Sequence, residues 1–267
     1  MSASPPLSEF DGRLILVTGA AQGIGAATAL RLGASGARLA LFDRDGDALS
    51  HTLAQLQAAG VRAQAWTVDL ADAAATRAAI AEVEQDGGAI EHLAHVAGVL
   101  RTGALLDGAD ALADWDACMA VNARALVGIA QALAPAMARR RRGSIVVVGS
   151  NAASAPRIGM AAYAASKAAA SQYLRCLALE LAPHGVRCNL VSPGSTDTPM
   201  QRAFAADEAA RNAILGGDAA RFRLGIPLGR IAAAEDVAEA VCFLLSERAR
   251  HITLHDLRVD GGATLDA

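Results

Sequence analysis

The stretch Leu14-Ile-Leu-Val-Thr-Gly-Ala-Ala-Gln-Gly-Ile-Gly25 joins an apolar run directly to a glycine-rich turn. The apolar run Leu14–Thr18 predicts a buried strand, and a helix is predicted from Ile24 onward. The backbone of such a turn can approach a pyrophosphate closely at Gly19, Gly23 and Gly25, and the amino end of the helix then receives the phosphates. Glycine-rich turns also serve as ordinary helix caps. The position directly after a strand nevertheless favours a dinucleotide site that includes Gln22 and Ile24.

The alternation of short apolar runs and longer Ala- and Leu-rich stretches continues along the chain. Several predicted strands are apolar throughout, which is typical of a parallel sheet covered on both faces. The sequence therefore predicts an α/β fold: one Rossmann-type, doubly wound parallel sheet of about seven strands with helices on both faces. The further strands are predicted at Arg38–Phe42, Ala63–Val68, His92–Val96, Ser144–Val148, Arg187–Val191 and Leu257–Val259. The helices are predicted at Ile24–Ala34, Asp47–Ala59, Asp72–Gln85, Asp114–Ala138, Met160–Leu181 and Glu235–Leu245.

Composition narrows the kind of protein and its partners. The chain is 53% apolar but only 3% aromatic, so its core must consist mainly of Ala, Leu and Val. A net charge of −3 gives no electrostatic footprint for nucleic acid or an anionic membrane. The four cysteines have no spacing that suggests a disulfide framework or a metal site. We expect a cytoplasmic protein without a metal, and without a nucleic-acid or membrane partner.

Domain organisation is predicted to be simple. Residues 1–10 contain prolines and serines without an apolar signal core, and we expect them to form a flexible N-terminus. Residues 11–267 show no linker and no repeat, which predicts a single domain. The least regular stretch, residues 198–228, is the expected position of a substrate lid. The longest apolar candidate for a membrane span, Ala123–Ala138, is interrupted by Arg124, Gln131 and Pro135.

Only one of the 24 lysine and arginine residues is a lysine, Lys167. It follows Tyr163 by four residues, and Tyr163 follows Ser150 by thirteen, which gives the pattern Ser-x12-Tyr-x3-Lys. An ammonium is a compact charge that a planar guanidinium cannot replace at a tight site. Tyr163 and Lys167 share one face of the predicted helix, so the ammonium is expected to stabilise a tyrosinate and to lower the pKa of the phenol. Ser150, at the end of a predicted strand, would then hydrogen-bond the reacting oxygen.

Two aspartates follow predicted strands where an adenosine would lie. Asp43 ends the second strand, roughly 20 residues past the glycines, where a carboxylate accepts hydrogen bonds from a ribose and repels a 2′-phosphate. This favours NAD over NADP, although Asp43 could be an ordinary loop carboxylate and the adjacent Arg44 could meet a phosphate. Asp69, with Leu70, follows the third strand and is expected either at the adenine edge or at a helix N-cap.

The glycine motif and the Ser-Tyr-Lys motif together resemble the short-chain dehydrogenase/reductase family, and the resemblance covers essentially the whole chain. Such a resemblance implies hydride transfer with a nicotinamide cofactor and, usually, a homotetramer. His95-Val-Ala97-Gly98 resembles the family's Asn-Ala-Ala-Gly stretch, with His95 in place of the usual asparagine. We expect His95 to have a small structural cost and no new catalytic role.

The same resemblance implies roles for further residues. Asn122 resembles the helix asparagine that the family uses to hold a water in a proton relay to lysine. Lys167 is implied to bind the nicotinamide ribose beside Tyr163. The stretch that begins at Pro193 resembles the family's nicotinamide-binding segment, and it contributes Pro193, Gly194, Thr196 and Thr198.

Several segments resemble one branch of the family, which oxidises 2,3-dihydro-2,3-dihydroxybenzoate to 2,3-dihydroxybenzoate in catechol siderophore synthesis. They are Ala155–Met160, Val186–Gln201, Leu224–Gly229, His251–Leu254 and the tail from Val259. The partner so implied is a small carboxylated cyclohexadiene. Arg157, between Ser150 and Tyr163, would pair bidentately with its carboxylate. The other residues expected to line the substrate site are Leu100, Thr102, Gly159, Ser195, Met200 and Gln201.

Three alternatives stay open. Arg157 would equally serve an acid with an amino group in place of a ring hydroxyl, as in a dihydro-hydroxyanthranilate dehydrogenase. A 3-oxoacyl-carrier-protein reductase is disfavoured by Asp43 and by the lack of a basic patch for an acidic carrier. A regulator that senses NAD without turnover would not need Ser150, Tyr163 and Lys167 together.

Overall fold

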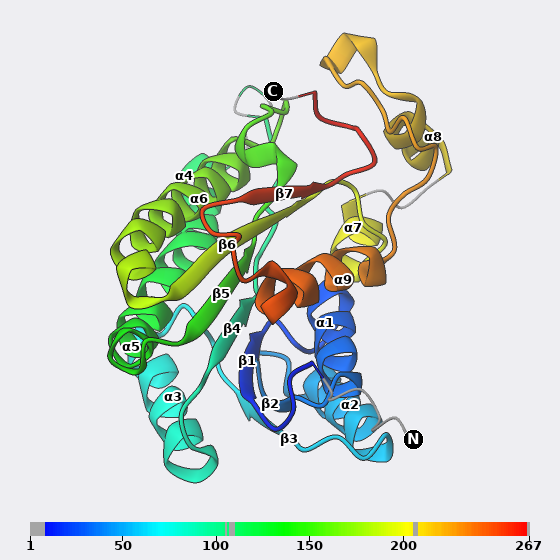
Figure 1. Ribbon diagram of the computed structural model, residues 1–267. Helices are drawn as coiled ribbons and strands as arrows, with labels where there is room; N and C mark the ends of the chain where they lie inside the picture. The colour runs from blue at the N-terminus through cyan, green and yellow to red at the C-terminus, as the bar shows by residue number, and fades with distance from the viewer. Residues whose placement is uncertain (1–8, 105, 107–109, 205–207, 266–267) are drawn as a thin grey trace.

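Seven strands form one parallel sheet in the computed structural model, in the order β3-β2-β1-β4-β5-β6-β7 (Figure 1). The structure describes residues 9–104, 106, 110–204 and 208–265. The strand order and the parallel pairing confirm the predicted doubly wound α/β fold. The strands are β1 (Leu14–Thr18), β2 (Arg38–Asp43), β3 (Ala63–Thr67), β4 (His92–His95), β5 (Gly143–Val148), β6 (Val186–Pro193) and β7 (Asp256–Val259).

Helices cover both faces of the sheet, and successive residues of each strand pack on opposite sides. In β1, Leu14 and Leu16 join the core under α3, α5 and α6, whereas Ile15 and Val17 join the core under α1, α2 and α9. Figure 1 shows these two helix layers on either side of the sheet. The helices are α1 (Gly23–Ala34), α2 (Gly46–Ala58), α3 (Ala73–Gly87), α4 (Ala111–Cys118), α5 (Ala125–Arg140), α6 (Ala161–Leu181), α7 (Pro199–Phe204), α8 (Glu208–Gly216) and α9 (Ala234–Leu245).

The helix predicted at Asp114–Ala138 is longer than expected and has a π segment, η2 (Met119–Arg124), between α4 and α5. The continuous run Ala111–Arg140 is long and apolar enough to cross a membrane by length and composition, with half of its most apolar window buried inside the protein. Much of that apolar character is explained by packing, because Leu126, Ile129 and Leu133 are at most 1% exposed in the core.

The chain enters the folded domain before residue 11. Phe10 is fully buried, and its ring packs edge-on against His92 at a centroid distance of 5.9 Å. The residue before it, Glu9, forms an ion pair with Arg248. Residues 1–8, for which we expected a flexible N-terminus, lie outside the described residues.

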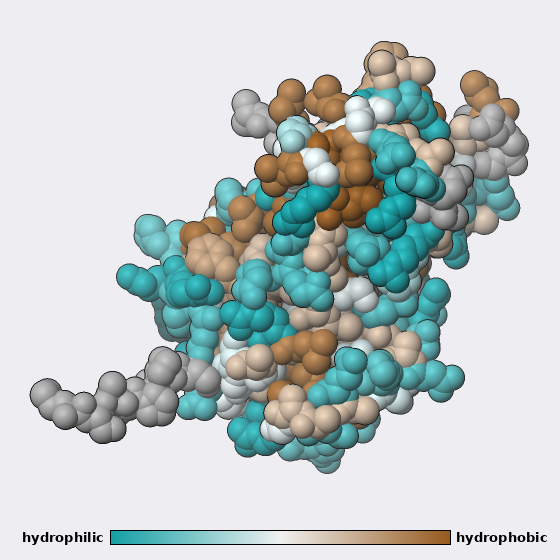
Figure 2. Space-filling model, turned by 90° about the vertical axis from the view of Figure 1, so that its right-hand side faces the viewer, coloured by the Kyte–Doolittle hydropathy of each residue, from teal (hydrophilic) through white to brown (hydrophobic). Residues whose placement is uncertain are grey.

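The segment expected to form a lid contains two short helices, α7 and α8, that the sequence did not predict. Ile214 and Ile226 are the buried apolar side chains among its described residues, and they form a small cluster separate from the two main cores. Figure 1 shows α8 standing away from the sheet. Figure 2 shows the side that carries α8, with apolar surface gathered in its upper part. The large apolar side chains that this segment exposes include Phe222, Leu224 and Leu228.

Candidate active site

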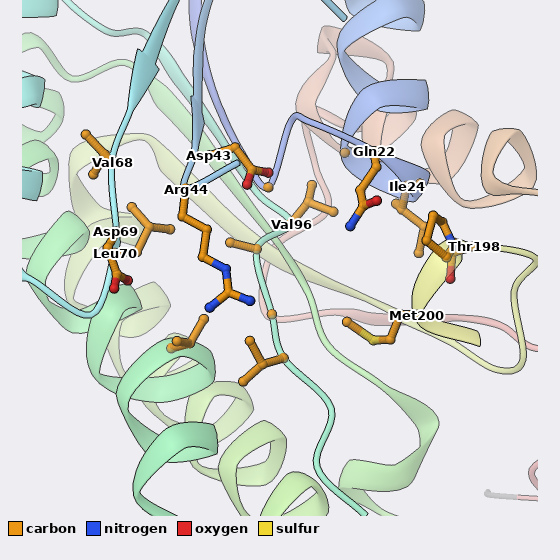
Figure 3. A pocket seen from close by; sticks show the side chains of 18 residues that line it. Gln22, Ile24, Asp43, Arg44, Val68, Asp69, Leu70, Val96, Thr198 and Met200 are labelled. Carbon is orange, nitrogen blue, oxygen red and sulfur yellow. The ribbon is translucent and has the colours of Figure 1, made fainter. Parts of the chain in front are cut away.

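Most residues predicted to bind a cofactor line one recess at the carboxyl end of the sheet (Figure 3). The sheet order reverses at β1 and β4, and such a switch point is where open α/β sheets bind ligands. Helix α1 starts here with no side-chain cap among the described residues and no acidic residue in its first turn, so its amino end can receive an anion. The predicted residues in this recess are Gly19, Gln22, Gly23, Ile24, Gly25, Asp43, Asp69, Leu70, Ala97, Gly98 and Thr198.

Two glycines make the turn between β1 and α1 possible. Gly19 has a φ of +69°, and a Cβ at this position would lie 2.8 Å from the backbone of Ala97. A Cβ at Gly25 would lie 1.8 Å from the carbonyl oxygen of Gly19. Because neither position has room for a side chain, the helix packs closely on the end of the strand and its first turn faces the recess.

Asp43 is held in place beside this turn by backbone donors. Its Oδ2 accepts a hydrogen bond from the Ala21 amide at 3.0 Å, and its Oδ1 accepts one from the Asp45 amide at 3.1 Å. Arg44 extends into the same recess (Figure 3), and no side-chain partner is found for it in the part of the chain that the structure describes. Asp69 accepts from the Ala71 amide, and the N-cap of α3 is Asp72, so Asp69 is not a helix cap.

His95 takes a structural place at the end of β4. The Thr18 hydroxyl oxygen accepts from the amides of Val96 and Ala97, and it also contacts His95 Nδ1 at 2.9 Å. Because the two amides occupy the acceptor capacity of the hydroxyl, its hydrogen is available to Nδ1. The His95 ring is then neutral with its proton on Nε2, a buried atom without a hydrogen-bond partner in the described structure. His95 therefore makes one bond that orders the β4 loop and leaves one polar atom unsatisfied.

Ser150, Tyr163 and Lys167 meet in a second recess. The lining residues that it shares with the first are Ile24, Val96, Gly98, Thr198 and Met200. Ser150 follows β5 in an extended conformation, and its hydroxyl accepts from the Ala152 amide at 3.1 Å. The other two project from α6. Lys167 is 5% exposed, and its Nζ donates to the Val148 carbonyl at 2.8 Å. The end of β5 thus fixes both the serine and the lysine.

The electrostatics of these groups differ from the sequence-based expectation. Burial of the phenol raises the pKa of Tyr163, and the nearby Ser150 hydroxyl acts in the opposite direction. Burial also lowers the pKa of Lys167 to about 8. The expected lowering of the Tyr163 pKa by Lys167 is not found in the protein alone, because desolvation dominates and the ammonium is bonded to Val148.

Asn122 lies in the π segment η2, and its buried side chain lines neither recess. Its Oδ1 accepts from the Val99 amide at 2.8 Å, and its Nδ2 donates to the Val99 carbonyl and to Ser166 Oγ, each at 2.9 Å. The side chain thus ties η2 to the loop after β4 and to α6. A Cβ at Gly98 would come within 3.2 Å of both Asn122 Oδ1 and Lys167 Nζ, so the three residues lie together.

The second recess also contains most of the predicted substrate residues. Thr102 and Gly159 line neither recess: Gly159 accepts a backbone bond from Gly103, which places it in the loop contact beside the site. Residues that the sequence did not single out include Asn151, Met160 and Arg223. The predicted substrate, nicotinamide and catalytic residues in this recess are Leu100, Ser150, Arg157, Tyr163, Lys167, Pro193, Gly194, Ser195, Thr196, Thr198, Met200 and Gln201.

Three polar side chains in this recess have no partner among the residues described. They are the Arg157 guanidinium, the Arg223 guanidinium and the buried Gln201 Nε2. Burial lowers the pKa of Arg157, and the neighbouring charge of Arg223 lowers it further. Unpaired donors at partly buried positions carry a desolvation cost that a ligand with acceptor oxygens would offset.

The sequence profile described as short chain dehydrogenase matches residues 13–209. A 2,3-dihydro-2,3-dihydroxybenzoate dehydrogenase of Bacillus subtilis is 46% identical over 256 residues, covering 96% of this chain and 97% of its own. A vibriobactin-specific 2,3-dihydro-2,3-dihydroxybenzoate dehydrogenase of Vibrio cholerae is 42% identical, covering 94% of this chain and 96% of its own. Among solved structures, a 7 alpha-hydroxysteroid dehydrogenase complexed with NADH superposes with a TM-score of 0.88 at 26% identity, covering 97% of both chains.

Proposed function

Because the chain belongs to the short-chain dehydrogenase family, we propose that it oxidises a ring hydroxyl of 2,3-dihydro-2,3-dihydroxybenzoate, which yields the catechol 2,3-dihydroxybenzoate. The observation that carries this proposal is the recess that joins Arg157 to Ser150 and Tyr163, because an acid-binding group then lies beside the reacting groups. The relatives that share 42–46% identity over nearly the full length carry the name of this activity. A place in siderophore synthesis follows from the same likeness.

The residues of the first recess fit a nicotinamide dinucleotide. The uncapped amino end of α1 would receive the pyrophosphate, and Asp43 would accept from the adenosine ribose. Pro193, Gly194 and Thr196 would hold the nicotinamide end beside Tyr163 and Lys167. We propose NAD rather than NADP, because a carboxylate held by two backbone donors would repel a 2′-phosphate.

When bound, the oxidised nicotinamide supplies a hydride acceptor; the chain's own residues handle the proton. Ser150 donates a hydrogen bond to the reacting hydroxyl oxygen, and Tyr163 as tyrosinate takes the hydroxyl proton while the carbon gives up its hydride. With the cofactor bound, Lys167 would hold the ribose and stabilise the tyrosinate, and Asn122 orders η2 behind it. Tyr163 needs such stabilisation because burial raises its pKa in the protein alone, and the positive charge of an oxidised nicotinamide would contribute to it.

Oxidation leaves a ring ketone, which tautomerises to the aromatic catechol without a further oxidant. The gain of aromaticity makes the reaction effectively one-directional. Arg157 would bind the ring carboxylate through two parallel hydrogen bonds, and the free amide of Gln201 would donate to a ring hydroxyl. This arrangement sets which ring carbon faces the cofactor.

The chain offers a matched pair of tyrosines for testing the mechanism, because its only other tyrosine, Tyr173, lies ten residues further along the same helix and outside both recesses. Tyr163→Phe should reduce kcat by at least about 1,000-fold while NAD binding is retained. Tyr173→Phe should leave kcat near that of the parent protein. The measurement is the formation of NADH from the dihydrodiol acid. Full activity in Tyr163→Phe would exclude this tyrosine as the base.

A further inference from the structure

Arg223 approaches the reacting groups from a part of the chain far from the other site residues. It lines the same recess as Ser150, Arg157 and Tyr163, but it lies in the segment between α8 and α9. Arg157, in contrast, lies in the loop between β5 and α6. Two arginines from separate segments of the chain therefore line one small recess.

The turn that carries Arg223 is tightly organised. Asp218 and Arg223 exchange both backbone hydrogen bonds, each 2.9 Å long, and the Asp218 carboxylate accepts from the Arg221 amide at 3.3 Å. Phe222, between them, adopts a left-handed conformation with a φ of +55°. A Cβ at Gly217 would lie 2.6 Å from the Arg223 carbonyl oxygen, so the two sides of the turn pack backbone against backbone. The left-handed conformation of Phe222 costs conformational energy, and the paired backbone bonds hold the backbone of Arg223 in place beside the recess that it lines.

Arg157 and Arg223 differ from nearby arginines because no described carboxylate forms an ion pair with either of them. Nearby Arg202 and Arg230 are paired with Asp197 and Asp236. Neither Arg157 nor Arg223 has a side-chain hydrogen bond or ion pair with any residue that the structure describes. Burial lowers the pKa of Arg223, and the charge of Arg221 adds to this effect.

Two carboxylates lie close enough to influence these cations but are already occupied. Asp260, which favours the charged form of Arg157, accepts from Asn151 Nδ2 at 3.2 Å and from the Gly262 amide at 3.0 Å. Asp218 favours the charged form of Arg223 but is used as the cap of its own turn. Neither forms a salt bridge to the two guanidinium groups within the described residues.

We propose that Arg223 is a specificity-determining residue that binds the substrate carboxylate together with Arg157. The proposal rests on the proposed function and extends it, because it assigns the acid to two arginines instead of one. A carboxylate has about four lone pairs, enough for both guanidinium groups. The bound acid links the lid segment to the β5–α6 loop, and a neutral diol leaves both cations desolvated and unpaired.

Kinetics with an acid and a neutral substrate test this role. Arg223→Gln should raise KM for the dihydrodiol acid by about 10- to 100-fold with little change in kcat, the range expected for a charged hydrogen bond. For the same cyclohexadiene diol without the carboxylate, kcat/KM should stay at the parent value. Arg223→Lys should recover part of the loss. Arg221→Gln, an exposed position on the same turn, is the matched control and should behave as the parent.

Binding without turnover separates this proposal from the function on which it rests. The parent protein with NADH should bind benzoate more tightly than benzamide, and Arg223→Gln should remove most of that preference while NADH affinity is unchanged. If the parent oxidises no dihydrodiol acid but shows this benzoate preference, the proposed function fails and the role of Arg223 stands. Equal benzoate affinity in the parent and Arg223→Gln, or equal losses for acid and neutral diol, would overturn it.

Discussion

Lowering the pH from 7 to 5 is expected to destabilise the folded protein through two buried histidines, His92 and His95. Each is 2% exposed, and burial lowers the pKa of each from 6.5 to about 3. Neighbouring positive charges lower the two pKa values further. Arg13 has the largest such effect on His92, and Lys167 has this effect on His95. Both nitrogens of His92 and Nε2 of His95 lack partners among the described residues, so nothing there offsets a proton on either ring.

The direction of the effect follows from which state binds protons. An unfolded chain protonates each ring below its ordinary pKa of 6.5, whereas the folded protein resists protonation down to about 3. The unfolded state therefore binds more protons in this window, and the free energy of unfolding falls as the pH falls. At pH 5 the loss is about 2 kcal/mol for each histidine and about 4 kcal/mol for both, at about 1.4 kcal/mol for each pH unit. That is a large part of a typical stability of about 5–15 kcal/mol.

Urea unfolding at several pH values and one protein concentration measures this loss. His95→Asn removes the titrating ring and keeps a polar group that can bond Thr18, and His92→Leu replaces an unpartnered ring by an apolar side chain. Each variant should lose about 2 kcal/mol less than the parent between pH 7 and 5. His51→Gln, at an exposed position on α2, is the control and should keep the parent's full loss. If both buried variants lose as much as the parent, the histidines are not the cause.

Two further substitutions test the site. Lys167→Arg should reduce kcat/KM by about 100-fold or more, because Lys167 is buried with its Nζ 2.8 Å from the Val148 oxygen, and a wide planar guanidinium cannot reproduce the position of that compact ammonium. Steady-state kinetics would contradict this if the variant matched the parent. Asp43→Asn should raise the NADP-to-NAD ratio of kcat/KM by about tenfold, because a negative charge near a 2′-phosphate is removed. Asp47→Asn, just beyond the recess, should leave that ratio unchanged, and an equal change in both variants would argue against a specific role of Asp43.

The centre of the sheet could be predicted from the sequence because β1, β4 and β5 are buried throughout, and β1 and β5 in particular appear as apolar runs. Leu14–Thr18 was predicted with the bounds that the structure has, and β2 differs from its prediction by one residue. The π segment at Met119–Arg124 has no comparable local pattern. It coincides with the bonds that Asn122 makes to Val99 and Ser166, contacts that exist only in the folded protein.

The candidate site, like the fold, could be predicted from the sequence only in part. Lys167 could be singled out because it is the only lysine, and the pattern with Tyr163 and Ser150 predicted that the three meet in one recess. Arg223 could not be distinguished from the other 22 arginines, because the turn at residues 217–225 alone brings it to the site. The direction of the Tyr163 pKa shift also depends on burial, which spacing does not reveal.

The most direct test of the proposed function is the stoichiometry of one reaction. The purified protein, given 2,3-dihydro-2,3-dihydroxybenzoate and NAD, should form NADH and 2,3-dihydroxybenzoate in equal amounts. Its kcat/KM for this substrate should be higher than for 2,3-dihydro-3-hydroxyanthranilate, the acid with an amino group in place of a ring hydroxyl. Replacement of NAD by NADP should lower the rate. Absence of both products from a protein that binds NADH would contradict the assigned activity, and faster turnover of the amino-substituted acid would assign the enzyme to that substrate instead.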